Sequence, residues 1–257
     1  MKIFAAVFIA ILFLAVTSRS QTSILPDAEI QGRQLAQQLC ETQPAESFTN
    51  SGVLQIRDSN GKRFDFPIAF EIVVTATNWQ SVYETIQTLT NGFSYHNQLK
   101  ITHSSGQPNR YGFYLPNRSG VRSANGDTLN WSEANSTWAF NDTFGDFYPV
   151  DLGLEFFHWP QQKVLKKEVK RSRGCTVLES ANPNPSTNGY SRVVSWIDNE
   201  SGGIVQAQAY DAANKLLKEF YPKDFKKVDG QWQVQMMQIE NVQTGSRSRL
   251  EFDVDKP

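Results

Sequence analysis

The sequence lacks the residue patterns that most enzyme active sites need. It contains three histidines, His96, His103 and His158, and none stands in a His-Glu-x-x-His pattern or another metal-ligand spacing. No glycine-rich phosphate loop occurs, and residues 189–193 lack the second glycine of a nucleophile elbow. We therefore expect no catalysis and no bound metal or cofactor, and a hydrolase ranks last among the functions considered.

An excess of charge of one sign is also missing. The 25 lysines and arginines nearly balance the 26 aspartates and glutamates, and the formal net charge is -1. This balance gives no reason to expect a nucleic-acid partner. Aromatic residues make up 12% of the chain, which excludes a disordered protein or a coiled coil. That aromatic content suits a filled core or an internal cavity equally well.

Residues 3–16 form an apolar run that directly follows Lys2. The run is too short to span a bilayer comfortably, and small residues follow it, as in a cleavable signal peptide. We expect cleavage before Arg19 or Gln21, so that residues 1–20 are the signal peptide. Residues 21–257 would then form a single exported domain in the periplasm. An uncleaved anchor helix is the alternative.

Cysteine is nearly absent, since Cys40 and Cys175 are the only two. In an exported protein an even number of cysteines invites a disulfide. A bridge between these two would join an N-terminal helix to the sheet and contribute about 2–4 kcal/mol to stability. The alternative is two unlinked thiols, with Cys40 packed on the apolar side of its helix. Sequence spacing says nothing about the distance between them, so both alternatives stay open.

Short segments with alternating apolar and polar residues are abundant. A helical turn at residues 151–158 ends before Pro160, and such segments then follow one another to the C-terminus, separated by turn-forming residues. They span residues 163–171, 176–179, 190–197, 204–210, 216–221, 231–241 and 247–254, with similar segments upstream at 53–58, 64–77, 99–103 and 111–115. The connections are too short for crossovers, so we expect a mainly β protein with a large curved antiparallel sheet.

Three segments depart from this pattern. Residues 26–43 predict an amphipathic helix, capped by Asp27 and weakened by Gly32, whose apolar stripe must be buried on another element. The spacing in residues 79–89 fits a helix or a strand. Residues 117–146 are rich in small polar residues with scattered Trp and Phe, which predicts a long loop held by its aromatic side chains.

Several motifs resemble those of the LolA-like family of outer-membrane lipoprotein-sorting proteins. They are DLGLEFFHWP at 151–160, KVLKK at 163–167, GYSRV at 189–193, FYPKDFKK at 220–227, NVQTGSR at 241–247, TNSGVL at 49–54 and THSSGQPN at 102–109. The resemblance covers roughly residues 50–254. It implies a half-open β-barrel whose apolar inner face is covered by short helices, with a strand at 79–89. It also implies that the N-terminal helix lies across the barrel mouth and that the cavity carries lipoprotein acyl chains.

The resemblance makes the apolar inner face the candidate site, with residues that would line a cavity for lipoprotein acyl chains or lipid. These residues are Leu54, Ile56, Ile68, Phe70, Ile72, Val74, Phe113, Leu115, Trp232, Val234, Met236 and Phe252. Without the resemblance, a closed core is the more ordinary reading of such a face. We expect a monomeric periplasmic carrier in outer-membrane lipoprotein sorting, with an inner-membrane transporter as a candidate partner. The alternative is a non-enzymatic accessory or lipid-sensing module beside a membrane transporter.

Six basic residues gather between positions 163 and 173. They are Lys163, Lys166, Lys167, Lys170, Arg171 and Arg173. On a strand these side chains fall on both faces, which favours a solvated strand protected from edge pairing. The functional alternative is a docking surface for an anionic lipid head group or an acidic partner.

Overall fold

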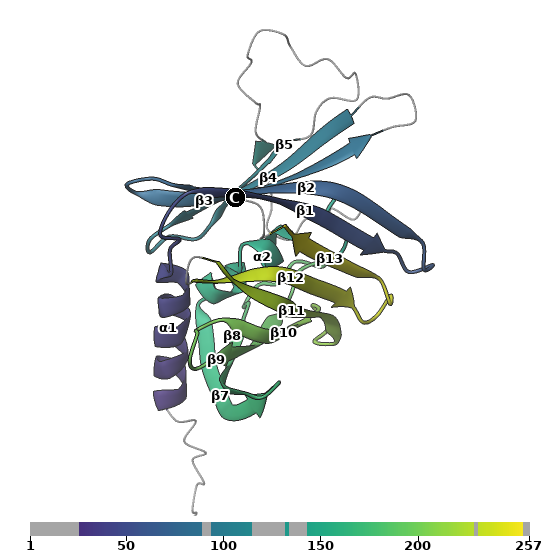
Figure 1. Ribbon diagram of the computed structural model, residues 1–257. Helices are drawn as coiled ribbons and strands as arrows, with labels where there is room; N and C mark the ends of the chain where they lie inside the picture. Colours follow the sequence, from purple (N-terminus) through teal and green to yellow (C-terminus); the bar gives the residue numbers. More distant parts are fainter. Residues whose placement is uncertain (1–25, 89–93, 115–131, 134–142, 229–230, 254–257) are drawn as a thin grey trace, which may run out of the picture.

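The computed structural model describes residues 26–88, 94–114, 132–133, 143–228 and 231–253 (Figure 1). Within this part of the chain, thirteen strands form one antiparallel sheet in the order β6-β5-β4-β3-β2-β1-β13-β12-β11-β10-β9-β8-β7. The N-terminal strands are β1 (Phe48–Arg57), β2 (Arg63–Val74), β3 (Asn78–Thr88), β4 (Ser94–Ser104), β5 (Arg110–Tyr114) and β6 (Ser132–Glu133). The C-terminal strands are β7 (Gln161–Lys170), β8 (Arg173–Ala181), β9 (Arg192–Asp198), β10 (Ile204–Tyr210), β11 (Leu216–Val228), β12 (Gln231–Asn241) and β13 (Arg247–Phe252).

The order of the strands shows two meanders that are joined by a single long-range pairing. Consecutive strands pair with one another from β1 to β6 and from β7 to β13, and β1 also pairs with β13, with Leu54 opposite Leu250. The two ends of the sheet, β6 and β7, are not paired with one another, so the sheet curves without closing into a barrel. The expected mainly β fold with a large, half-open antiparallel sheet is confirmed.

In the described residues three helical elements accompany the sheet: α1 (Pro26–Glu41), α2 (Pro149–Leu152) and the 3-10 helix η1 (Glu155–His158). Figure 1 shows α1 beside the C-terminal strands and α2 between the two meanders. Helix α1 packs on β7 and η1. A Cβ atom added at Gly32 would lie 2.5 Å from the backbone nitrogen of Lys163, so only glycine permits this close approach. Gly32 lowers the intrinsic stability of α1, but it allows the helix to pack closely on β7.

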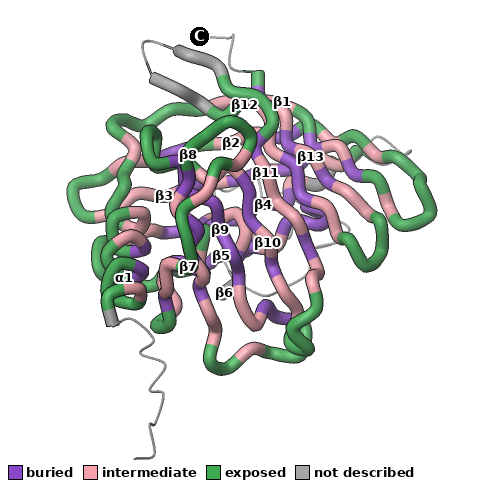
Figure 2. Tube along the Cα trace, turned by 90° about the horizontal axis from the view of Figure 1, so that it is seen from below, coloured by how far each residue is buried: buried purple, intermediate pink, exposed green. Residues whose placement is uncertain are grey.

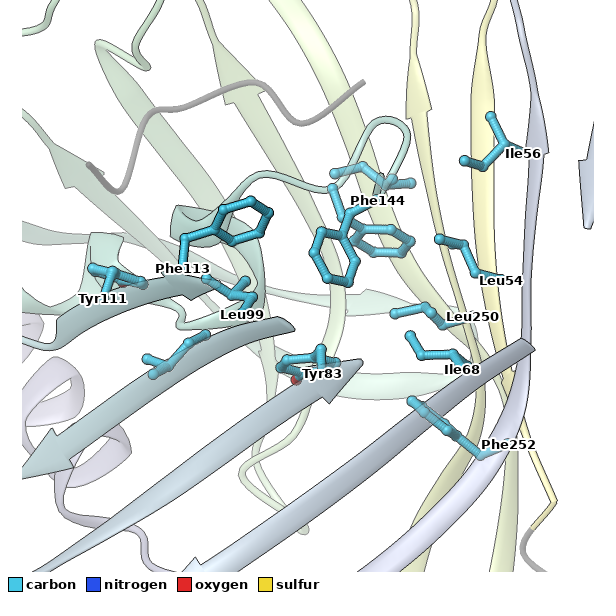
Figure 3. Packing of buried hydrophobic residues seen from close by; sticks show 13 residues of the cluster. Leu54, Ile56, Ile68, Tyr83, Leu99, Tyr111, Phe113, Phe144, Leu250 and Phe252 are labelled. Carbon is cyan, nitrogen blue, oxygen red and sulfur yellow. The ribbon is translucent and has the colours of Figure 1, made fainter. Parts of the chain in front are cut away.

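The core lies on the inner face of the sheet. Figure 3 shows side chains of both meanders pointing toward one another, among them Leu54, Phe113 and Leu250. Phe144, which precedes α2, fills the space between them and is 1% exposed. A second cluster joins α1 and η1 to β8, β9 and β10. Figure 2 shows buried residues running along the strands, while exposed residues gather at the turns, on α1 and along the edge strand β7.

Most of the expected elements are present. Residues 79–88 of the ambiguous segment belong to a strand, β3, and the apolar stripe of α1 packs on the second cluster, with Ala36 buried and Leu35, Leu39 and Cys40 partly buried. Strand β11 continues past the expected end at Tyr221 because a bulge follows Pro222 and accommodates its missing N–H. Residues 1–20 and most of the expected loop at 117–146 lie outside the described residues. No helix in the described ranges is long and apolar enough to cross a membrane.

The possible Cys40–Cys175 disulfide is not formed. Both cysteines are free. Cys40 packs with the second cluster under α1, whereas Cys175 belongs to a third cluster with Val177 and Trp196. The two thiols are therefore separate packing groups, which was the alternative reading of the sequence.

Candidate functional site: an apolar groove beside the N-terminal helix

A groove of about 390 Å³ lies between the C-terminal end of α1, the two meanders and the segment that links α2 to η1. Its size falls within the range of about 300–1,000 Å³ that is usual for ligand pockets. Its walls are mainly apolar or aromatic, and they include Leu39, Trp79, Tyr83, Phe220, Phe225 and Met237. The arrangement suits an apolar ligand held without directional polar contacts.

The segment between α2 and η1 supplies the third wall. Leu152 at the end of α2, Leu154 in the link and Phe157 in η1 face the groove. Leu154 adopts a left-handed backbone conformation with φ of 49°. A leucine in that conformation costs about 1–2 kcal/mol, and here it leaves a large apolar side chain partly exposed at the groove. Such strain concentrates at functional positions, and it supports the assignment of the groove as the site.

Among the described residues predicted to line the cavity, one lies at the groove and others lie in the closed core. Val234 lines the groove. Leu54, Ile56, Ile68, Phe113 and Phe252 lie instead in the closed core cluster, and Phe70 packs against that cluster. Ile72 is buried and Val74 is half-buried on β2. Much of the inner face is therefore filled, as in the alternative of a closed core.

The remaining candidates are Met236, Trp232 and Leu115. Met236 is opposite Glu251 in the register of β12 and β13, and the adjacent Met237 is opposite buried Leu250. Successive strand residues point to opposite faces, so Met237 and not Met236 reaches the groove. Trp232 lies on β12, but its side chain is outside the described part, as is all of Leu115.

Sequence reasoning missed most of the groove walls, although it identified the segments that hold them. Leu39 and Cys40 belong to the apolar stripe of α1, which needed a partner. Leu154 and Phe157 lie in DLGLEFFHWP, and Phe220 and Phe225 lie in FYPKDFKK. Both motifs carried the family resemblance. Their resemblance to LolA-like proteins is the sequence signal that could have identified these groove-lining residues.

Two polar groups at the groove are held in their neutral forms. The ring of His103 stacks on Trp79 with a centroid distance of 3.6 Å. Burial lowers the pKa of His103 to about 4, so its imidazole is neutral at pH 7. Burial and the nearby Glu155 raise the pKa of Cys40 to about 11, which leaves an unreactive thiol. Neither group supplies a nucleophile or a charge to the groove.

Glu155 directly follows the groove-lining Leu154, and the pKa of its carboxyl group is raised. Its carboxylate accepts a hydrogen bond of 2.9 Å from the hydroxyl of Tyr111. Burial raises the pKa of Glu155 to about 7, and the hydrogen bonds from Tyr111 and Asn109 only partly oppose this effect. The carboxyl group therefore changes its charge close to neutral pH.

This pKa predicts a pH dependence of stability. The folded-state pKa of about 7 exceeds the unfolded value of 4.5, so the folded state holds the Glu155 proton more tightly. Stability from this source is fully present below pH 4.5 and is lost as the pH rises to 7. We expect this loss to reach up to about 3 kcal/mol. Chemical denaturation across this pH range should show a shallower loss in Glu155→Gln than in the wild type. Parallel curves would contradict the assignment.

A buried ion pair lies beneath the groove. The Nζ atom of Lys218 donates to the carbonyl oxygen of Asp146 at 2.6 Å and lies 3.5 Å from Asp151 Oδ2. Asp151 also accepts hydrogen bonds from the hydroxyl of Tyr190 and the backbone N–H of Tyr148. Burial lowers the pKa of Lys218 to about 8 and raises that of Asp151, while their mutual attraction opposes both shifts. The pair fixes α2 to β11 at the base of the site.

Among the described side chains, no group of three or more His, Cys, Asp or Glu is arranged to hold a metal ion.

A family model described as an uncharacterized protein matches residues 97–255, which is more than half of the chain. The chain belongs to this family. No curated protein matches it significantly. The matched region contains α2, η1 and all of the C-terminal strands, and so most of the groove walls.

Three solved structures share the fold. A DUF1329 family protein from Desulfovibrio piger superposes with a TM-score of 0.67 at 18% identity, covering 90% of this chain and 95% of its own. A putative outer membrane lipoprotein-sorting protein domain from Vibrio parahaemolyticus gives 0.65 at 17%, covering 88% and 91%. A LolA superfamily protein from Nitrosomonas europaea gives 0.58 at 14%, again covering 88% and 91%. The resemblance to LolA-like proteins is confirmed at the level of the fold.

Proposed function

We propose that this protein is a periplasmic carrier that binds lipoprotein acyl chains or lipid in the groove and takes part in outer-membrane lipoprotein sorting. The groove itself carries the proposal, because it is an unfilled apolar space of about 390 Å³ in an otherwise packed inner face. Two solved proteins of the same fold are described by that sorting role or by the LolA superfamily. Export would depend on the predicted signal peptide at residues 1–20.

The physical chemistry of the groove fits an acyl chain. Each buried methylene group contributes about 0.8 kcal/mol, so a chain that buries about ten of them gains about 8 kcal/mol before the cost of association. His103 and Cys40 at the walls are uncharged at neutral pH, and Asp151 is paired with Lys218. An apolar chain therefore meets no unpaired charge from these groups.

Val234→Asp is expected to weaken the binding of an environment-sensitive fluorescent fatty acid by about tenfold, because it places a carboxylate in the apolar wall. Val53→Asp is the matched control. Both valines are on strands and 37% exposed, but Val53 does not line the groove. Fluorescence titration should show wild-type affinity for Val53→Asp. Displacement of the probe by a lipopeptide would identify the acyl chain as the ligand.

Equal affinities of the two variants would contradict the site. A wild-type protein that binds no probe would contradict carriage. It would favour the alternative function, an accessory or lipid-sensing module beside a membrane transporter.

A further inference from the structure

The hairpin of β7 and β8 ends in a basic turn, Lys170-Arg171-Ser172-Arg173. Two of its basic side chains, those of Lys170 and Arg173, interact with nearby side chains. Lys170 lies over the ring of Trp196, and Arg173 is 3.4 Å from Asp198 and 3.3 Å from Glu200. Arg171 differs, because its guanidinium lies 4.4 Å from the ring centroid of Tyr221 on β11. Strand β11 is three places from β8 in the sheet order, so the curvature of the sheet brings the turn over it.

The backbone at this turn is strained in a way that fixes Arg171. Arg171 and Ser172 have φ of 48° and 63°, although neither is a glycine. Such two-residue turns favour Asn-Gly or Gly-Gly, since other residues pay about 1–2 kcal/mol for the left-handed conformation. Glycine here would relieve the strain but remove the cation from Tyr221. Retained strain of this kind points to a role for the side chain.

A second backbone irregularity brings Lys223 to the same ring. Pro222 pairs with Met237 and Asp224 pairs with Met236, so a bulge leaves Lys223 without a register partner. Bulges re-aim side chains, and the Nζ atom of Lys223 lies 5.8 Å from the ring centroid of Tyr221. Two unrelated irregularities thus direct two cations at one tyrosine.

Hydrogen bonds extend this arrangement across β12 to β13. The hydroxyl of Tyr221 accepts a bond of 2.5 Å from Gln238 Nε2, and Gln238 Oε1 accepts one of 3.3 Å from Arg249. Gln238 is 1% exposed, which makes it a fixed link. None of the described residues accepts a hydrogen bond from the Tyr221 hydroxyl, so its hydrogen can be donated to a ligand.

The positive charges around Tyr221 are not neutralised within the described part of the chain. None of Arg171, Lys223 and Arg249 has a carboxylate oxygen within 4.0 Å there. Burial and the neighbouring Arg249 and Arg247 lower the pKa of Lys223, while Asp224 opposes them. Asp224 offsets the repulsion between these like charges only in part, and an anionic ligand would reduce it further.

We propose that Arg171, Tyr221, Lys223 and Arg249, here called the Tyr221 cluster, bind the phosphate group of an anionic phospholipid at a membrane surface. Guanidinium groups match phosphate oxygens in pairs, and the tyrosine hydroxyl adds a donor. Val169, two residues before Arg171 in the same hairpin, is 74% exposed. A cationic cluster beside an exposed apolar side chain is the combination that favours a lipid interface over a soluble phosphate.

Cosedimentation with phosphatidylcholine vesicles, with and without phosphatidylglycerol, tests this site on the full chain. The wild type should prefer the anionic vesicles, and Arg171→Gln, Lys223→Gln and Arg249→Gln should each weaken that binding by about fivefold. Arg110→Gln is the control, because it removes one exposed positive charge outside the cluster. Tyr221→Phe should also weaken binding several-fold without changing the net charge. Circular dichroism must show the same sheet content in every variant.

The competing occupants give different results. Binding of inorganic phosphate that is lost in Arg171→Gln, without any preference for anionic vesicles, would overturn the lipid surface in favour of a soluble phosphate. Competition by polyglutamate without vesicle binding would overturn it in favour of an acidic protein. Losses in Arg110→Gln equal to those in the cluster variants would also overturn it. The site is independent of the groove, so fatty-acid binding should survive in Arg171→Gln.

Discussion

Lys218→Met is expected to lower the free energy of unfolding by about 3–5 kcal/mol, because it leaves a buried carboxylate without its cation. Lys218 is 1% exposed, and its ammonium group lies 3.0 Å from the ring centroid of Tyr148. Asp151 would keep its hydrogen bonds from Tyr190 and Tyr148 but lose the positive charge that compensates its burial. Urea denaturation monitored by circular dichroism measures the difference.

Two further variants separate the charge effect from loss of packing. Lys215→Met, at an exposed turn position on the same hairpin, should change stability by less than about 0.5 kcal/mol. Adding Asp151→Asn to Lys218→Met should recover part of the loss, since the uncompensated charge is then removed. A double variant less stable than the single one would show that Asp151 is not the partner that matters.

Gly32→Ala is expected to destabilise the protein by about 1–3 kcal/mol through overpacking. In an exposed helix the same change would stabilise by about 1 kcal/mol. Here the new methyl group would lie 2.5 Å from Lys163 N and 2.6 Å from Gln162 C, both of them backbone atoms that cannot move aside easily. The helix would have to move away from β7. Because α1 supplies Leu39 and Cys40 to the groove, fatty-acid binding should weaken as well.

Hydrogen exchange at α1 and chemical denaturation together measure this effect. Gln34→Ala, on an exposed position of the same helix, should leave both unchanged within about 0.5 kcal/mol. A Gly32→Ala variant that is more stable than the wild type would show that the close approach of α1 to β7 is not required.

The strands could be predicted from the sequence because their signal is local. Alternation of apolar and polar residues defines a half-buried strand, and turn residues such as Asp229-Gly230 separate one strand from the next. Residues 79–89 were ambiguous because Trp79, Val82, Tyr83 and Ile86 fit helical spacing. They form a strand because they pair with β2 and β4, and a local sequence pattern does not show this pairing.

The groove could not be predicted residue by residue, because a cavity is the space that packing leaves unfilled. Phe144 and Phe147 come from the segment before α2 and fill the inner face over Leu54 and Ile56. No periodicity in the strands indicates where such a loop will lie. The bulges in β11 and β12 shift the register, so that Met237 takes the place that strict alternation from Val234 gives to Met236.

Mass spectrometry of lipid extracted from the purified protein tests the central claim most directly, because a carrier should retain part of its cargo. We predict that acyl-containing species copurify with the wild type and with Val53→Asp and are depleted from Val234→Asp. Wild-type protein that carries no lipid, and takes none up when incubated with a lipopeptide, would contradict the proposal that the groove binds acyl chains.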